Sequence, residues 1–212
     1  MKKFNVIRIE KGELIISGYG DQLIWNKANT ISNFISPWNN TKTEKTEFKS
    51  LWDGENLFFQ FKVIDKLIHI DKTDNSFNSI GNSDRVELFF RKDAKLNPYY
   101  CLEIDPTPRI MDFRAFPNRN FEFDWNFSKK DLLVKSSINE EGFIVEGAIG
   151  INYLKELDLI NEGKVEVGVF RAKYNKNNNL EYKPTWISWV EPKSKTPNFH
   201  IPSSFGVFYL LS

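Results

Sequence analysis

The segment NSDRVELFF (residues 82–90) places charged side chains at alternating positions of a predicted β-strand. Successive side chains of a strand point to opposite faces, so Arg85 and Glu87 share one face while Val86 points to the other. A guanidinium and a carboxylate on one accessible face can hydrogen-bond neighbouring hydroxyl groups of a ligand. The same spacing also suits a cross-strand ion pair, and the sequence leaves both interpretations open. Asp84 is predicted to accept hydrogen bonds where the strand begins.

Two tryptophans in PTWISWVEP (residues 184–192) are candidates for stacking against the apolar face of a ligand. Trp186 and Trp189 are three positions apart, which places them on opposite faces of a strand, so one can be exposed while the other is in the core. Trp186 is preferred as the exposed residue because the preceding EYKPT is polar and loop-like, and Trp189 is the second choice. Core packing is the alternative for each.

Only two histidines, His69 and His200, are available for acid–base or metal chemistry. His200 lies in NFHIPSSFG (residues 198–206), where proline, serine and glycine favour a turn. We therefore interpret His200 as making a structural hydrogen bond that anchors this loop, rather than as a ligand. The single cysteine, Cys101, lies in an apolar segment and is predicted to be a buried thiol rather than a nucleophile.

The composition is typical of a globular protein, with 41% hydrophobic and 27% charged residues. The formal net charge of +1 gives no electrostatic reason to expect nucleic acid or an anionic membrane surface as a partner. No apolar run is long enough to cross a membrane. The two N-terminal lysines are not followed by an uninterrupted apolar run, so no signal peptide is expected and the chain is cytoplasmic at face value. A removed leader would instead make it extracellular or periplasmic.

Alternation of apolar and polar residues is the dominant pattern along the chain. In NLFFQFKVID (residues 56–65), for example, Leu57, Phe59 and Phe61 share one face. Similar short segments recur between glycine, asparagine, aspartate and proline residues. We therefore predict an all-β fold, an antiparallel β-sandwich of the immunoglobulin or jelly-roll kind, formed by a single domain over residues 1–212.

Three segments depart from this pattern. Residues 151–159, INYLKELDL, predict the one short helix of the fold. Residues 39–50 are rich in lysine, glutamate and threonine and predict a solvated loop. Residues 174–182, YNKNNNLEY, predict the tip of a long hairpin.

Seven segments, in their order along the chain, resemble the family-9 carbohydrate-binding modules: LWDGENLFFQFKVID, NSDRVELFF, YYCLEIDPTPRIMD, GFIVEGAIG, VGVFRAKY, TWISWVEP and FHIPSSFG. The resemblance extends over most of the chain, from the first of these segments to the last. It implies a DOMON-like β-sandwich and a protein that binds sugars.

The resemblance also implies roles for individual residues. Glu87 matches a sugar-binding carboxylate of the family, and a stacking tryptophan is expected at Trp186, with Trp189 as second choice. Arg109 and Arg171 lie where the family carries polar residues near its ligand, so both are predicted to bind sugar hydroxyls. A structural pair with a buried carboxylate is the alternative for each arginine.

The chain departs from the family before the NSDRVELFF segment, where characterised modules carry a second stacking tryptophan. This chain has FNSIGNSD (residues 77–84) there. Phe77 or Ile80 would form a poorer wall, or the site would be open on one side, or its function would have been lost or changed. Trp125 is a further candidate for a wall residue, with core packing as the alternative.

We therefore predict non-catalytic binding of plant-type or related oligo- or polysaccharides in glycan breakdown, with no oligomeric state indicated. One alternative is a haem-binding domain, because related sandwiches hold haem between a methionine and a histidine. Its ligands would come from Met111, His69 and His200.

A second alternative is a glycoside hydrolase that uses paired carboxylates. Its acids would come from Glu87, Glu103, Asp105 and Asp112. No spacing among these residues distinguishes an acid from a nucleophile, so binding without catalysis is preferred.

Structural calcium is a further implication of the resemblance, because modules of this type often carry such ions. Oxygen donors in or beside loops are Asp53, Asp65, Asp71 and Asp74. The spacing of an EF-hand is absent, so no metal site is assigned and these residues are predicted to form turns.

Overall fold

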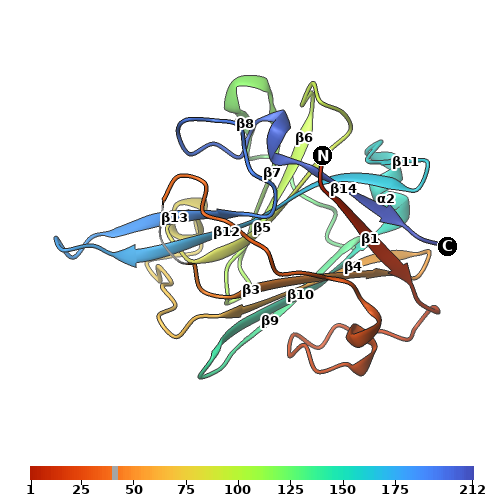
Figure 1. The fold of residues 1–212 in the computed structure, drawn as a ribbon, viewed down its shortest axis with the longest axis horizontal. Helices are drawn as coiled ribbons and strands as arrows, with labels where there is room; N and C mark the ends of the chain where they lie inside the picture. The colour runs from red at the N-terminus through yellow and green to blue at the C-terminus, as the bar shows by residue number, and fades with distance from the viewer. Residues whose placement is uncertain (40–42) are drawn as a thin grey trace.

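The computed structural model describes residues 1–39 and 43–212 (Figure 1). Its strands are β1 (Lys3–Arg8), β2 (Thr30–Ile31), β3 (Thr46–Trp52), β4 (Asn56–Ile64), β5 (Arg85–Arg91), β6 (Tyr99–Ile104), β7 (Ile110–Phe116), β8 (Asn120–Glu122), β9 (Leu132–Ile138), β10 (Gly142–Gly150), β11 (Ile160–Asn161), β12 (Lys164–Lys176), β13 (Tyr182–Ser188) and β14 (Gly206–Leu210). Its α-helices are α1 (Phe77–Gly81) and α2 (Ile151–Glu156).

The strands form two sheets that share β1. The first sheet has the order β8-β7-β6-β5-β12-β14-β1, and the second has the order β1-β3-β4-β10-β9. The first four residues of β1 pair with β14 and its last two residues pair with β3, and both pairings are parallel. All other pairings are antiparallel in the part of the chain that the structure describes. The predicted antiparallel sandwich is confirmed, with β1 as its parallel exception.

The main hydrophobic core lies between the two sheets. Strand β4 contributes Leu57, Phe59 and Phe61 to this core, as the alternation predicts, and β5 contributes Val86 and Leu88. Each of these side chains is at most 2% exposed. The alternation of side chains along each strand therefore determines which residues pack between the two sheets.

The outer faces of both sheets are also covered. A second apolar cluster covers the outer face of the first sheet and includes Phe89, Phe170 and Phe199. A third cluster forms where the segment after β1, including Trp25, packs over Phe58 on the second sheet. Residues that share a face with Phe89 therefore lie in a largely dry environment, although their alternation suggests a solvated face.

The helices and one strand differ from the sequence prediction. Helix α2 ends at residue 156, three residues earlier than predicted, and α1 is an additional helix whose first turn is capped by the Ser76 side chain. The predicted loop over residues 39–50 is wrong from residue 46 onwards, because β3 buries Thr46 and Phe48 on alternate positions. Residues 40–42 of that segment lie outside the described residues. None of the helices described is long and apolar enough to cross a membrane.

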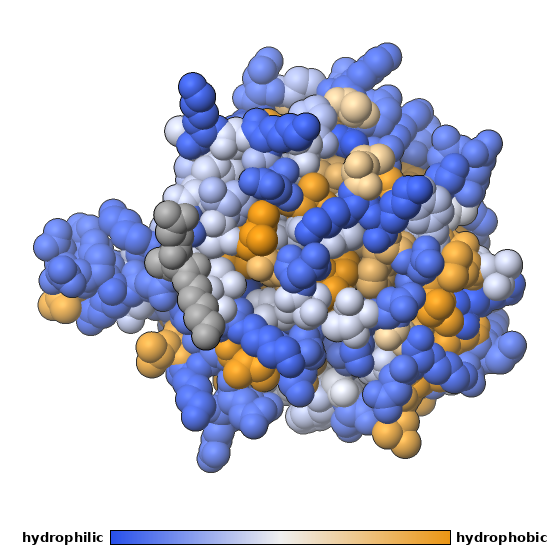
Figure 2. Space-filling model, in the orientation of Figure 1, coloured by the Kyte–Doolittle hydropathy of each residue, from blue (hydrophilic) through white to orange (hydrophobic). Residues whose placement is uncertain are grey.

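The hairpin formed by β12 and β13 projects from the body of the protein (Figure 1). Residues 177–181 form its tip, which confirms the predicted hairpin. The surface of this projection is largely hydrophilic (Figure 2). The end of β13 that is nearer the body carries Trp186, so the hairpin connects a solvated tip to the covered outer face of the first sheet.

Replacement of Gly147 by alanine is expected to destabilise the fold. A Cβ atom at this position of β10 would lie 2.3 Å from Phe59 Cζ and 2.6 Å from the carbonyl oxygen of Leu133. Overpacking of this kind costs about 1–3 kcal/mol, which urea denaturation would measure as a lower free energy of unfolding. Gly81→Ala is the control, because a Cβ atom there would have no neighbour nearer than 4.0 Å. Equal stability of the two variants would contradict the prediction.

Candidate functional site

A pocket with a volume of about 190 Å³ opens on the outer face of the first sheet. Its floor is formed by β5 and β6, and its walls come from β7, β8, β13 and the segment between β13 and β14. Trp38, from the segment before β3, completes the wall. The pocket combines charged side chains at the floor with aromatic walls, an arrangement that suits a ligand with both polar groups and an apolar ring face.

The floor of the pocket is a buried cluster of one guanidinium and two carboxylates. Glu87 on β5 lies directly opposite Glu103 on β6. Arg85 donates from Nε to Glu103 Oε2 at 2.5 Å and from Nη1 to the carbonyl oxygen of Gly81 at 2.7 Å. Arg85 Nε is also 3.1 Å from Glu87 Oε1, but its single hydrogen is directed to Glu103. Glu87 Oε1 is therefore left without a hydrogen-bond partner among the residues described.

The electrostatics of the floor follow from its burial. Arg85, Glu87 and Glu103 are 5%, 2% and 4% exposed. Burial, together with repulsion from Glu103, raises the pKa of Glu87 to about 8 against the opposing attraction of Arg85. Burial also raises the pKa of Glu103, again opposed by Arg85. With one guanidinium between two carboxylates, the floor holds a proton at neutral pH.

The aromatic wall is built around Trp186. Trp186 pairs with Ala172 on β12, and Ala172 pairs with Arg85 on β5, so the tryptophan and the arginine lie in one cross-strand row. The guanidinium carbon of Arg85 is 5.5 Å from the Trp186 ring centroid. Phe199 meets Trp186 edge-on at a centroid distance of 5.8 Å and lies 5.5 Å from Trp38. These contacts fix the orientation of the Trp186 ring at the pocket.

His200 anchors the loop before β14 and also lines the pocket. Its Nδ1 is 2.9 Å from the hydroxyl oxygen of Tyr99, and its ring stacks on Phe89 at a centroid distance of 5.0 Å. The predicted structural hydrogen bond is therefore confirmed. Burial lowers the pKa of His200 to about 3, with the positive charges of Arg119 and Arg85 contributing. The imidazole is uncharged at neutral pH.

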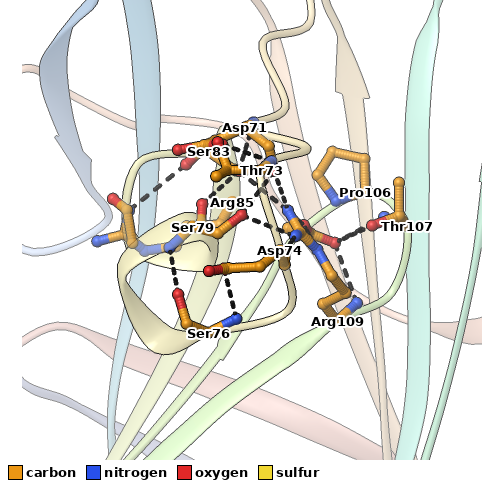
Figure 3. A network of polar contacts seen from close by, with 12 residues as sticks. Asp71, Thr73, Asp74, Ser76, Ser79, Ser83, Arg85, Pro106, Thr107 and Arg109 are labelled. Carbon is orange, nitrogen blue, oxygen red and sulfur yellow. Dashed lines mark hydrogen bonds and ion pairs between the residues drawn. The ribbon is translucent and has the colours of Figure 1, made fainter.

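Arg109 lies outside the pocket, in the polar network of Figure 3. Its Nε donates to Asp105 Oδ2 at 2.7 Å, and its Nη2 donates to the carbonyl oxygen of Asp71 at 2.8 Å. Its Nη1 donates to the carbonyl oxygen of Asp74 and, at 2.9 Å, to the hydroxyl of Ser79. The guanidinium thus joins the turn after β6 to the segment that precedes β5, as in the structural pair given above as the alternative.

Arg171 also lies outside the pocket and is completely buried. Its Nη2 donates to Asp65 Oδ2. Lys173 Nζ lies 2.9 Å from the same oxygen and 3.0 Å from Asp84 Oδ2. Asp84 accepts the backbone N–H of Tyr174 at 2.6 Å, which confirms its prediction as an acceptor at the start of the strand. This cluster ties the segment between β4 and β5 to β12.

The remaining tryptophan candidates pack in the core between the sheets. Trp189 is 3% exposed and lies on the opposite side of the first sheet from Trp186, as their spacing predicts. Trp125 packs on Tyr100 at a centroid distance of 4.8 Å. Of the five residues predicted to bind a ligand, the structure brings Glu87 and Trp186 together in the pocket, and their arginine partner is Arg85.

Phe77 and Ile80, considered above as a second wall of the site, lie outside the pocket. Ile80 is buried in the outer cluster, and Phe77 packs on Phe123 at a centroid distance of 5.5 Å. Neither side chain lines the pocket, whereas Phe123 and Phe121 do. Sequence reasoning missed these two phenylalanines and Trp38, since nothing in their local sequence marks them as neighbours of Glu87.

The pocket contains some of the candidate haem ligands and hydrolytic acids, and the others lie elsewhere. Met111 lines the pocket with His200, whereas His69 lies elsewhere, stacked on Tyr182 at 3.5 Å. Glu87 and Glu103 share the floor. Asp105 is held by Arg109, and Asp112 accepts the backbone N–H of Phe127 at 2.5 Å.

The aspartates considered for calcium accept hydrogen bonds from turn amides. Asp53 accepts the N–H groups of residues 55 and 56, and Asp65, Asp71 and Asp74 each accept the N–H two residues later. These contacts confirm the predicted turns. Across residues 1–39 and 43–212, no group of three or more histidine, cysteine, aspartate or glutamate side chains is placed to hold a metal ion.

Comparison with known proteins identifies relatives of this fold. The family model described as "Carbohydrate family 9 binding domain-like" matches residues 16–212. A solved Bacteroides uniformis protein, whose carbohydrate binding is a provisional assignment, is similar with a TM-score of 0.75 at 15% identity, covering 99% of each chain. A search of the curated proteins finds no match.

Two solved structures of family-9 carbohydrate-binding modules from Caldicellulosiruptor kristjanssonii are also similar. The complex with glucose has a TM-score of 0.64 at 17% identity and covers 99% of this chain and 96% of that chain. The complex with cellotriose has a TM-score of 0.64 at 18% identity and covers 99% of this chain and 93% of that chain. These likenesses show a common fold.

The raised pKa of Glu87 predicts a pH dependence of stability. Between the ordinary glutamate pKa of 4.5 and about 8, the folded protein holds a proton that the unfolded chain has lost, so the stabilisation is complete below pH 4.5 and lost as pH rises to 8. The stability of the wild type relative to Glu87→Gln should fall over this window and then level off. Urea denaturation at four pH values would measure the difference in free energy of unfolding between the wild type and Glu87→Gln. Both proteins contain His200, so its titration cancels in this difference. Glu181→Gln is the control, because the pKa of this exposed acid is lowered by Lys183. A flat difference for Glu87→Gln would contradict the prediction.

Substitution of Arg171 should affect stability rather than ligand binding. Arg171→Met leaves the buried Asp65 with Lys173 as its remaining ionic partner, and breaking a buried pair costs about 3–5 kcal/mol. Chemical denaturation would detect the lower free energy of unfolding. The folded fraction of Arg171→Met should bind its ligand with the affinity of the wild type. Lys92→Met, which breaks the exposed pair with Asp158, should leave the midpoint unchanged. A stable Arg171→Met variant with weakened binding would reverse this assignment.

Proposed function

The chain belongs to the carbohydrate family 9 binding domain-like family, and on that premise we propose that its pocket binds one residue of an oligo- or polysaccharide without cleaving it. The observation that carries the proposal is the convergence of Glu87, Arg85 and Trp186 on one pocket. The proposed site therefore includes Glu87 and Trp186 from the sequence prediction and leaves out Arg109, Arg171 and Trp189.

The chemistry of the pocket suits a sugar ring. The C–H groups on one face of a pyranose are apolar and pack on an aromatic ring such as Trp186 or Phe199. Sugar hydroxyls donate hydrogen bonds, and Glu87 Oε1 is a buried acceptor without a partner among the described residues. The volume of about 190 Å³ lies below the range of about 300–1,000 Å³ for drug-sized ligands, which favours one sugar residue over a longer segment.

We propose plant-type or related polysaccharides, including those that carry amino sugars, as the source of this sugar residue. The structurally similar modules of Caldicellulosiruptor kristjanssonii bind glucose and cellotriose, which supports a ligand of the gluco series. At identities of 17% and 18%, this support concerns the ligand class and not individual contacts.

The arrangement of the acids favours binding over hydrolysis. A glycoside hydrolase places its two carboxylates on either side of the scissile bond. Here Glu87 and Glu103 are neighbours on one floor and both pair with the same nitrogen of Arg85. Haem binding remains a hypothesis that the absorption spectrum after addition of haemin would test.

Trp186→Ala is expected to weaken sugar binding by at least about tenfold, because it removes the main stacking surface of the pocket. Isothermal titration calorimetry with a panel of gluco-, xylo- and amino-oligosaccharides would measure the affinity, with tryptophan fluorescence as a second signal. The matched control is Tyr182→Ala, which removes a ring stacked on His69 outside the pocket and should bind like the wild type. Equal affinities of wild type and Trp186→Ala would exclude this pocket as the site, and no binding across the panel would contradict the function.

A further inference from the structure

The floor of the pocket is one positive charge short, and the inference drawn from this rests on the function proposed above. Glu87 and Glu103 are both buried, and Arg85 is the cation between them. Arg85 directs its Nε hydrogen to Glu103 and its Nη1 group to the carbonyl oxygen of Gly81. Glu87 Oε1 lines the pocket without a hydrogen-bond partner among the residues described. Once Glu87 is ionised, a ligand group that faces this oxygen therefore has to be a hydrogen donor.

The other ionisable groups near the floor do not supply the missing charge. Arg119 is exposed at the rim, with its guanidinium carbon 5.9 Å from the Phe121 ring centroid. Its charge acts on His200, but among the residues described it forms no ion pair with Glu87 or Glu103. Burial keeps His200 uncharged by lowering its pKa to about 3. Burial also raises the pKa of Tyr174, so its hydroxyl stays neutral and donates a hydrogen bond to the carbonyl oxygen of Gly81. The environment of Glu87 is therefore negative once this acid ionises.

The walls are suited to a cation as well as to a sugar ring. Trp38, Trp186 and Phe199 line the pocket, and a positive charge is attracted to the face of an aromatic ring. A ligand hydroxyl donates one hydrogen and carries no charge, whereas an ammonium group donates three hydrogens and carries a full positive charge. An ammonium group thus meets both requirements of the floor.

We propose that the pocket selects a sugar residue with a free, protonated amine, a hexosamine, whose ammonium group binds Glu87 and Glu103 while its ring packs on Trp186. Glu87 ionises when the ammonium group binds, so the complex releases a proton at neutral pH. Titrations in two buffers with different heats of ionisation should reveal this proton release.

The experiment compares matched sugars by calorimetry at pH 7. Glucosamine is compared with glucose and galactosamine with galactose, so that each pair differs by the amine, and the N-acetylated sugars serve as uncharged controls. In at least one pair, the amine should bind tenfold tighter or more than its parent, and the N-acetylated form should bind no tighter than the parent. Glu87→Gln and Glu103→Gln should each reduce the preference to less than twofold. Glu55→Gln, an exposed acid paired with Lys11 outside the pocket, should keep it.

Each outcome decides the inference. Parents that bind as tightly as their amines in both pairs would overturn it and leave the proposed carbohydrate binding intact. A preference that persists in both glutamine variants would also overturn it, because the amine would then be recognised elsewhere. No binding of any sugar would overturn the inference and the proposed function together. Circular dichroism checks that the variants fold, and if one glutamine variant fails to fold, the other variant and the N-acetylated sugars decide.

Discussion

Burial of both faces of the first sheet is the constraint on which the rest of the structure depends. A charged residue on such a sheet has little access to water, so it needs an ionic partner within the protein or a proton. Arg91 meets this requirement with Glu166, at 2.6 Å between Nε and Oε2. At the pocket the requirement is met only in part, because Arg85 lies between Glu87 and Glu103. The same dry environment that makes the sheet stable thus makes its unbalanced acid available to a ligand.

Alternation predicts most of the sandwich because the burial of every second residue is a local property of a strand. Strand β3 is an exception, since Glu47 and Lys49 alternate with Thr46 and Phe48 and give the segment the composition of a loop. Helix α1 has five residues, which is too short for a helical period to be recognised. The outer apolar layers could not be predicted, because they depend on distant segments that fold over each sheet.

The candidate site was predictable to the extent that local pattern and family resemblance mark single residues. Both lead to Glu87 and Trp186. The approach of Glu103 to Glu87 depends on the register between β5 and β6, and the contribution of Trp38 depends on the path of a segment far away in the chain. The local sequence does not decide the role of Arg109, because an arginine with apolar sequence neighbours has the same local pattern in a binding site and in a structural network. Its partners are decided by the tertiary fold.

The two parallel pairings of β1 have a mechanical consequence. Lys3 to Val6 run beside Val207 to Leu210 in the same direction, so the start of one strand lies next to the start of the other. A force that pulls apart the segments before β1 and after β14 would shear this pair along its length. The load would then fall on all its hydrogen bonds at once rather than on one after another. A domain held between a surface and a tethered load would resist extension through this contact, even though it spans only four residue pairs.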